Sequence, residues 1–159
     1  MKRNHNSIAQ ISMKVIMMLF MFIMCSNVEA AKKRVVISNT LIDSICKVES
    51  SNNANAIGDN GKAVGIAQIH KICVDDINRI CKLKKNGLKF SYDDRKSVSK
   101  SKQMLKIYLQ FYGDQYLRKT GKVPTNEILS RIWNGGPTGY NKKATIAYSM
   151  KVNRHLAFA

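Results

Sequence analysis

The sequence predicts one mainly α-helical domain, and three observations support this class. Apolar residues recur at three- and four-residue spacings along about five segments, which is typical of amphipathic helices. Clusters rich in Gly, Asn, Asp, Ser and Pro separate these segments. The chain of 159 residues contains no internal repeat and no interdomain linker, and its length is sufficient for one hydrophobic core.

Residues 1–30 are typical of a signal peptide. They begin with a basic segment, continue with an apolar run at residues 15–25, and end with small residues at the position that a signal peptidase reads. The apolar run spans only about 16 Å as a helix, roughly half of a bilayer core, so an uncleaved membrane anchor is the alternative. We therefore expect an exported protein whose mature domain is residues 31–159.

The mature domain is strongly basic. The whole chain has 27 basic residues (Lys and Arg) and 10 acidic residues (Asp and Glu). Residues 1–30 contain three of the basic and one of the acidic residues, so the mature domain has a formal charge of +15. Such a charge attracts polyanions, including anionic polymers of the cell envelope. The sequence has no basic stripe interleaved with aromatic residues and no zinc-finger spacing, so we expect no specific nucleic-acid partner.

Three cysteines remain in the mature domain, Cys46, Cys73 and Cys81. In one continuous helix Cys73 and Cys81 would be about 12 Å apart, which is too far for a disulfide. Either Cys46 pairs with one of them, or that helix breaks, or all three are buried thiols. His70 and His155 have no metal-ligand spacing, so we expect no metal and no cofactor.

The first predicted helix covers residues 41–50 and follows three good N-cap residues, Ser38, Asn39 and Thr40. On a helical wheel its apolar side chains fill one arc, and Glu49 falls in the middle of that arc. A carboxylate that faces a core needs partners, or its pKa rises until the neutral form is stable. A glutamic acid that stays protonated near neutral pH can protonate a leaving oxygen. The structural alternative is an ordinary glutamate whose position the wheel misplaces.

A loop rich in Asn, Gly and Asp follows the first helix. Residues 59–61, Asp-Asn-Gly, are a tight-turn signal, and we expect a small β-hairpin around residues 54–66. The segment 65–69 comes next and carries one polar side chain, Gln68, between apolar neighbours. Before the first helix, residues 35–37 are either a short strand or a segment that packs on the domain.

Four further helices follow in the second half of the chain, each with a start or stop signal. Asn-Gly ends the first of them, Asp93 and Asp94 open the second, and residues 112–114, Tyr-Gly-Asp, interrupt or end it. Residues 125–127 open the third, and a Gly- and Pro-rich segment ends it. The first, third and fourth predicted ranges are 72–85, 128–133 and 142–156. The second helix is basic at first and then amphipathic over residues 98–111.

Three separated motifs carry a resemblance to a known family. They are Glu49-Ser50 at the end of the first helix, Gly-Ile-Ala-Gln-Ile at 65–69, and Trp-Asn-Gly-Gly-Pro at 133–137, before a final helix that contains Tyr148. In this order they resemble the lytic transglycosylase domain of the lysozyme superfamily. That family has a Glu-Ser pair, a Gly-Leu-Met-Gln-Ile-like segment, an Ala-Tyr-Asn-Ala-Gly-Pro-like segment and a later Tyr near the catalytic centre. The resemblance covers residues 41–156 and implies a lysozyme-like fold.

The resemblance implies cleavage of the β-1,4 bond between N-acetylmuramic acid and N-acetylglucosamine in peptidoglycan. Glu49 would protonate the glycosidic oxygen and then act as base on the 6-hydroxyl of muramic acid, which closes a 1,6-anhydro product. Gln68 and Asn134 match positions that shape the sugar cleft, Tyr148 matches the tyrosine near the acid, and Ser50 matches the motif serine. The implied partners are peptidoglycan glycan strands, and we expect a monomer.

This sequence departs from the family pattern at three positions. Ala67 stands where the family usually has Met, and Trp133 and Gly135 replace the usual Tyr and Ala. These departures affect the expected walls of the cleft more than the expected fold.

Two other functions remain alternatives at this stage. A hydrolytic lysozyme would need a second carboxylate, and Asp59, in the loop after the first helix, is the acid placed to supply it. The high positive charge also fits a non-catalytic cationic protein that binds the cell wall. A lone glutamate favours the transglycosylase, because its nucleophile is a hydroxyl of the substrate itself.

Overall fold

The computed structural model describes residues 33–158, and the predicted signal peptide at residues 1–30 lies outside the described residues. From Arg34 onward the chain forms one compact unit. Its helices and strands are mostly short, apart from one helix of 23 residues. In chain order they are α2 (Asn39–Ser50), β1 (Ile57–Gly58), η1 (Asp59–Gly61), β2 (Ala63–Val64), α3 (Lys71–Lys84), η2 (Tyr92–Lys96), α4 (Val98–Thr120), α5 (Asn126–Gly135), η3 (Gly139–Asn141), η4 (Lys143–Thr145) and α6 (Ile146–Leu156).

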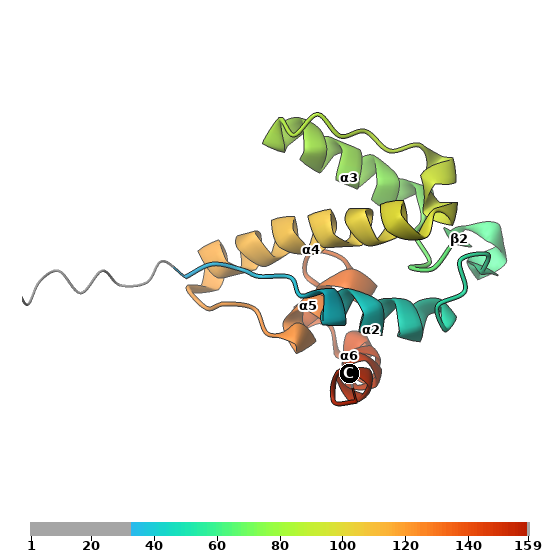
Figure 1. The fold of residues 1–159 in the computed structure, drawn as a ribbon. Coiled ribbons are helices and arrows are strands. Elements are labelled where there is room, and N and C mark those ends of the chain that lie inside the picture. The colour runs from blue at the N-terminus through green and yellow to red at the C-terminus, as the bar shows by residue number, and fades with distance from the viewer. Residues whose placement is uncertain (1–32, 159) are drawn as a thin grey trace, which may run out of the picture. The chain divides into compact units, whose positions relative to one another are not determined.

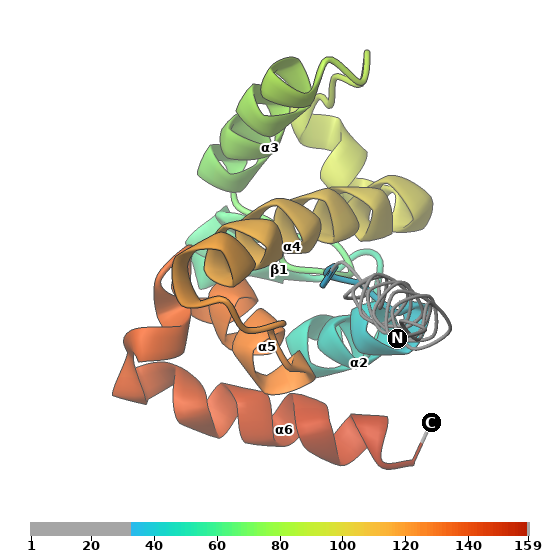
Figure 2. The same ribbon diagram turned by 90° about the vertical axis from the view of Figure 1, so that its left-hand side faces the viewer.

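Helix α4 is the centre of this unit. Figures 1 and 2 show α3 on one side of α4, and α2 and α5 with α6 beyond them on the other side. Helices α3, α5 and α2 all contact α4, and α6 packs against α2 and α5. The core therefore lies around α4, where Met104, Leu105 and Leu109 are fully buried. The predicted mainly α class is confirmed.

Helix α2 begins and ends where its sequence directs. The Ser38 hydroxyl accepts a hydrogen bond from the Leu41 N–H at 3.1 Å and caps the helix. At the other end Ser51 adopts a left-handed conformation, with a φ of 54°, and stops it. Leu41, Ile45 and other apolar side chains of one face are buried, as the helical wheel predicts. Glu49 therefore stands in the last turn of a well-defined helix.

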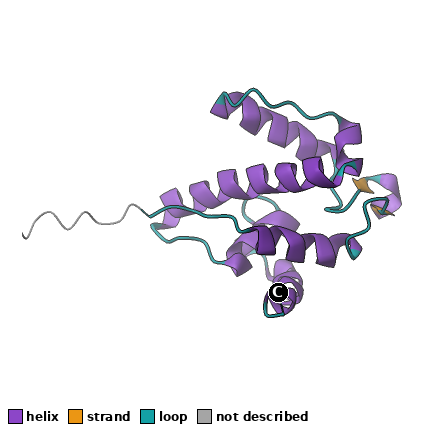
Figure 3. Ribbon diagram, in the orientation of Figure 1, coloured by secondary structure: helices purple, strands orange, loops and turns teal. Residues whose placement is uncertain are grey.

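The predicted hairpin around residues 54–66 is present, as the two short antiparallel strands β1 and β2 (Figure 3). Gly65, directly after β2, has a φ of +80°, and a Cβ built there would lie 1.8 Å from the backbone oxygen of Arg95. Only glycine allows this approach, so the hairpin lies directly on the segment η2. This contact fixes the position of the hairpin against η2.

Two sequence-based expectations about helix boundaries need correction, and the structure decides between the two alternatives for residues 35–37. Helix α4 does not end at residues 112–114, because Gly113 is a packing position: its missing Cβ would lie 3.0 Å from Val35 and 3.1 Å from Leu129. Residues 35–37 form no strand and pack as an extended segment with Val35 and Ile37 buried. The last helix begins at Ile146 rather than at residue 142, after two 3₁₀ turns.

The structure also selects one of the three alternatives for the cysteines. Helix α3 is continuous from Lys71 to Lys84, so it does not break between Cys73 and Cys81. Cys46, Cys73 and Cys81 are all free thiols, and Cys46 and Cys81 are buried. Within residues 33–158, no helix is long and apolar enough to cross a membrane.

Candidate active site

One cleft of about 430 Å³ is lined by residues from most of the elements. The end of α2 contributes Glu49, the hairpin contributes Asp59, and the segment after it contributes Gln68. The middle of α4 and the end of α5 contribute Tyr108 and Trp133 from the other side. Asn134, next to Trp133, also lines the cleft, which thus collects two carboxylates, two amides and two large aromatic rings from segments that are far apart in the sequence.

The Glu49 carboxyl is held by two aromatic side chains. Its Oε1 accepts a hydrogen bond from the Tyr148 hydroxyl at 2.7 Å and another from the Trp133 indole N–H at 3.0 Å. Its Oε2 has no hydrogen-bond partner among the described residues. Every buried side-chain oxygen in that part of the chain does have a partner, so Oε2 is not buried and is accessible. Since Oε1 already accepts two hydrogen bonds, the proton of a neutral Glu49 belongs on Oε2.

Burial raises the pKa of the Glu49 carboxyl above its usual value, because the charged form loses solvation. The hydrogen bonds from Tyr148 and Trp133 favour the charged form and oppose that rise. Neither donor is a cation, and Glu49 forms no salt bridge within residues 33–158. The site therefore keeps Glu49 protonated to higher pH than an exposed glutamate, while two donors remain ready to stabilise its carboxylate.

Both donors to Glu49 are fixed by their surroundings. The Trp133 ring meets the Tyr108 ring edge to face, with centroids 5.4 Å apart, and Tyr108 in turn contacts Tyr112 at 4.6 Å. Burial, followed by the nearby Glu49, raises the pKa of Tyr148, so its hydroxyl keeps its proton and acts as a donor. The orientation of the carboxyl is therefore set by α5 and α6.

The four other residues predicted for the site occupy different positions. Asn134 and Gln68 line the cleft, and Tyr148 contacts Glu49 directly. The Gln68 amide donates to the backbone oxygens of Gly65 at 2.9 Å and Ala56 at 3.2 Å, so its nitrogen holds the loop. The Ser50 hydroxyl donates to the Ile66 oxygen at 2.8 Å and ties the end of α2 to the segment 65–69. Ser50 thus has a structural contact with the backbone next to the cleft. Its contact with the substrate stays a prediction.

The second carboxylate of the cleft, Asp59, has a different environment. Its side chain is 54% exposed, and its Oδ2 lies 3.3 Å from Nε2 of His70. Asp59 also has a positive φ of 47°, which is uncommon outside glycine and holds it at the hairpin turn. Asp59 is thus an exposed carboxylate with one side-chain partner, whereas the Glu49 carboxyl is held by two donors.

Sequence reasoning did not include two residues that the structure brings to the cleft. Trp133 entered only as a departure from the family pattern, yet it donates to Glu49 across 84 positions of sequence. His70 was considered only as a metal ligand, and it lines the cleft beside Asp59. Cys73 lines the cleft too, but burial raises its pKa to about 12, so it is a poor nucleophile. Within residues 33–158, no cluster of His, Cys, Asp and Glu fits a metal ion.

Comparison with known proteins identifies the family. The sequence profile of the transglycosylase SLT domain matches residues 26–149, which is most of the chain. The chain belongs to this family. Membership supports a peptidoglycan-cleaving function of the lytic transglycosylase type, with peptidoglycan as the substrate. Among curated proteins, no sequence matches this SLT-domain chain at a significant level.

A solved structure supports the fold of this SLT domain independently. One chain of the crystal structure of Aeromonas hydrophila PliI in complex with Meretrix lusoria lysozyme superposes with a TM-score of 0.59. The two chains are 23% identical, and the match covers 77% of this chain and 93% of that one. The lysozyme-like fold that the motifs implied is therefore confirmed, with the small hairpin in place.

Proposed function

We propose that this protein is an exported lytic transglycosylase that cuts the β-1,4 bond between N-acetylmuramic acid and N-acetylglucosamine. Glu49 is the acid and then the base. The observation that carries the proposal is the buried Glu49 carboxyl, whose pKa is raised and whose Oε2 is accessible in the cleft. The SLT-domain match supplies the reaction class.

The geometry supports a two-step proton exchange. In the first step, Oε2 of Glu49 gives its proton to the glycosidic oxygen, the bond from C1 of muramic acid to that oxygen breaks, and the N-acetylglucosamine hydroxyl leaves. The carboxylate that forms is stabilised by Tyr148 and Trp133, which donate to its Oε1. These donors are in place before the charge develops, so the site needs no rearrangement.

In the second step, the Glu49 carboxylate takes the proton of the muramic acid 6-hydroxyl. That oxygen then bonds to C1 and closes the 1,6-anhydro ring. Glu49 regains the proton it gave, and no water is consumed. The chemistry therefore requires one carboxyl that changes role, which fits a cleft with one raised-pKa glutamic acid.

A hydrolytic lysozyme is the second candidate, because Asp59 lines the same cleft. In that reaction Asp59 would activate a water or attack C1, and the product would keep a reducing end. The Asp59 Oδ2 lies 3.3 Å from Nε2 of His70. The two reactions differ in their products by one water.

Mass spectrometry of the muropeptides released from purified peptidoglycan tests the proposal. Wild type should release anhydro-muropeptides, and Glu49→Gln should release none above background. Reducing-end products, one water heavier, would replace the proposal with hydrolysis that depends on Asp59. No product from any of several wall types, together with retained wall binding, would identify a cationic wall-binding protein instead. N-terminal sequencing of the secreted protein tests export and cleavage after residue 30.

A further inference from the structure

A second cavity, of about 350 Å³, opens next to the cleft at the start of α3. We call it the basic cavity and define it by residues 60–62, 70–72 and 95, which line it. His70 lines both the basic cavity and the cleft. The basic cavity and the cleft therefore adjoin at His70.

Arg95 gives the basic cavity a buried positive charge without a counter-ion. Arg95 is only 7% exposed and forms no ion pair within residues 33–158. Its Nε donates to the Tyr92 oxygen at 2.7 Å, and its Nη1 donates to the Lys62 and Ile69 oxygens at 3.2 and 3.1 Å. Its Nη2 has no hydrogen-bond partner among the described residues. Because every buried side-chain nitrogen there has a partner, Nη2 is not buried, and it is open to a ligand in the cavity.

The start of α3 adds further donors to the basic cavity. His70 is the N-cap residue, yet its side chain makes no capping hydrogen bond, and the first turn contains no acidic residue. The first N–H groups of a helix have no acceptor within the helix, so those of Lys71 and Ile72 are available. The side chains of Lys62 and Lys71 also border the cavity, and neither forms an ion pair within residues 33–158. The guanidinium, the two amides and the two lysines would together favour the binding of one oxyanion in the basic cavity.

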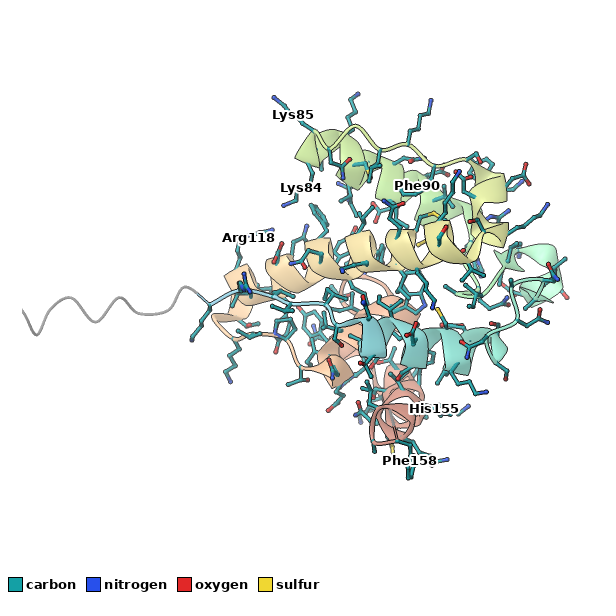
Figure 4. All side chains as sticks on the ribbon, viewed as in Figure 1. Lys84, Lys85, Phe90, Arg118, His155 and Phe158 are labelled. Atoms are coloured by element: carbon teal, nitrogen blue, oxygen red, sulfur yellow. The ribbon has the colours of Figure 1, made fainter. Side chains whose placement is uncertain are left out.

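The rest of the basic surface lacks this arrangement. Figure 4 shows Lys84 and Lys85 at the opposite end of α3, and Arg118 near the end of α4. Lys85 and Arg118 are exposed residues, and Lys84 lies over the Phe111 ring at 5.8 Å. Lys62 and Lys71 are exposed as well, and Lys71 Nζ lies 5.2 Å from the centroid of the Tyr92 ring. The two groups of cations differ in that Lys62 and Lys71 line a cavity together with a buried guanidinium and a helix start.

We propose that the basic cavity binds a carboxylate of the peptide stem that muramic acid carries beside the cleaved bond. This inference rests on the proposed function. In a stem-bearing strand the backbone sugars are neutral, because the lactyl carboxyl of muramic acid is held in the amide bond to the stem, so the stem is the part of the substrate that brings an oxyanion to this place. Arg95 Nη2, the α3 amides and the two lysines would bind that carboxylate and favour strands with charged stems over strands whose stem carboxylates are amidated.

Kinetics on a matched pair of substrates tests the preference. Glycan strands whose stems carry free carboxylates are compared with the same strands after those carboxylates have been converted to amides. In the full-length protein, Lys62→Glu with Lys71→Glu should lower the ratio of kcat/KM on the free-carboxylate strands to that on the amidated strands roughly tenfold, and the Gln pair should lower it less. Both lysines are exposed, so neither pair should impair folding.

The control is Lys151→Glu on α6, on the other side of the molecule from α3 (Figure 2). It is applied alone and together with Lys143→Glu, which changes an exposed lysine of η4, directly before α6. The control pair makes the same change in net charge away from the basic cavity. An equal fall of the ratio in the control pair, or no fall in the Lys62 and Lys71 pair, would overturn the inference.

A binding measurement separates this inference from the proposed function, because it needs no cleavage. NMR of the full-length protein should show shifts of the Lys71 and Ile72 amides and of Arg95 Nε when a free stem peptide is added. The same peptide with its carboxylates amidated should shift them less. Shifts with inorganic phosphate alone would overturn the assignment to the stem. Shifts without any peptidoglycan cleavage would support the basic cavity and contradict the transglycosylase.

Discussion

The two carboxylates of the cleft, Glu49 and Asp59, lie in opposite environments. Glu49 is held by the neutral donors Tyr148 and Trp133, and burial raises its pKa. Asp59 stands at the hairpin turn with a side chain that is 54% exposed, 3.3 Å from His70. The difference teaches that the surroundings of a carboxyl group, rather than the group itself, raise the pKa of Glu49 above its usual value.

The two walls are also built differently. The Glu49 wall combines the ends of α2 and α5 with α6, and aromatic rings fill it from Trp133 to Tyr108. The Asp59 wall is a hairpin of two-residue strands, fixed by the close approach of Gly65 to Arg95. The first wall suits an acid that must be held in one orientation, and the second suits contacts with substrate.

The largest expected effect comes from Glu49→Gln, which removes the proton donor and keeps the shape of the side chain. We expect the rate of anhydro-muropeptide release to fall by about 10²–10⁴, the usual contribution of a general acid or base. Asp43→Asn is the matched control, because Asp43 lies on the same helix, is exposed and pairs with Lys102 away from the cleft. Equal losses in both variants would remove Glu49 from its proposed role.

Tyr148→Phe should have the next largest effect, because it removes the shorter hydrogen bond to Glu49. We expect kcat to fall about 10–100-fold, since the developing carboxylate loses a donor. That bond lowers the pKa of Glu49, so its loss should raise this pKa and move the alkaline limb of the pH–rate profile to higher pH. Tyr140→Phe, which changes a hydroxyl without a partner among residues 33–158, should move neither quantity. A limb that moves to lower pH would contradict our account of the site.

Asp59→Asn should have a small effect, and it separates the two candidate reactions. A transglycosylase needs no second carboxylate, so kcat should change by no more than about threefold, the scale of a lost exposed ion pair. His70→Gln, which changes the other member of the pair, is the companion variant. A loss of 10² or more with Asp59→Asn alone would indicate a hydrolase, because hydrolysis depends on that carboxylate.

The smallest expected effect is on stability. The raised pKa means that folded Glu49 binds its proton more tightly than the unfolded chain does, so this contribution to stability is full at low pH and is lost as the pH rises through the native pKa. Glu49→Gln should therefore be more stable than wild type at high pH, by on the order of 1 kcal/mol, and the gap should close in acid. Chemical unfolding at several pH values measures this gap. A gap that widens in acid would mean that the native pKa is lowered.

The local parts of this picture could be read from the sequence. The 3.6-residue period placed Glu49 on the apolar face of α2, the N-cap at Ser38 set the start of that helix, and the Asp-Asn-Gly turn predicted the hairpin. The order of three short motifs predicted the lysozyme-like fold. The functional roles given to Ser50, Gln68, Asn134 and Tyr148 stay predictions.

The same local reasoning failed where the role of a residue depends on a contact with a residue far away in the sequence. Gly113 has the sequence signature of a helix end, but it continues α4 because Val35 and Leu129 occupy the space of its missing side chain. Trp133 looked like a departure from a motif, and its role as a donor depends on Glu49, 84 positions away.

The sequence by itself thus determined the helices, the hairpin and the face on which Glu49 lies, because each depends on residues a few positions apart. Tertiary structure alone decided that Tyr148 and Trp133 meet one oxygen of that carboxyl and leave the other accessible. It also decided that Arg95 carries its charge into a cavity beside the cleft. These features depend on contacts between α2, α5, α6 and η2, and on the water that such packing excludes, which no local pattern of residues records.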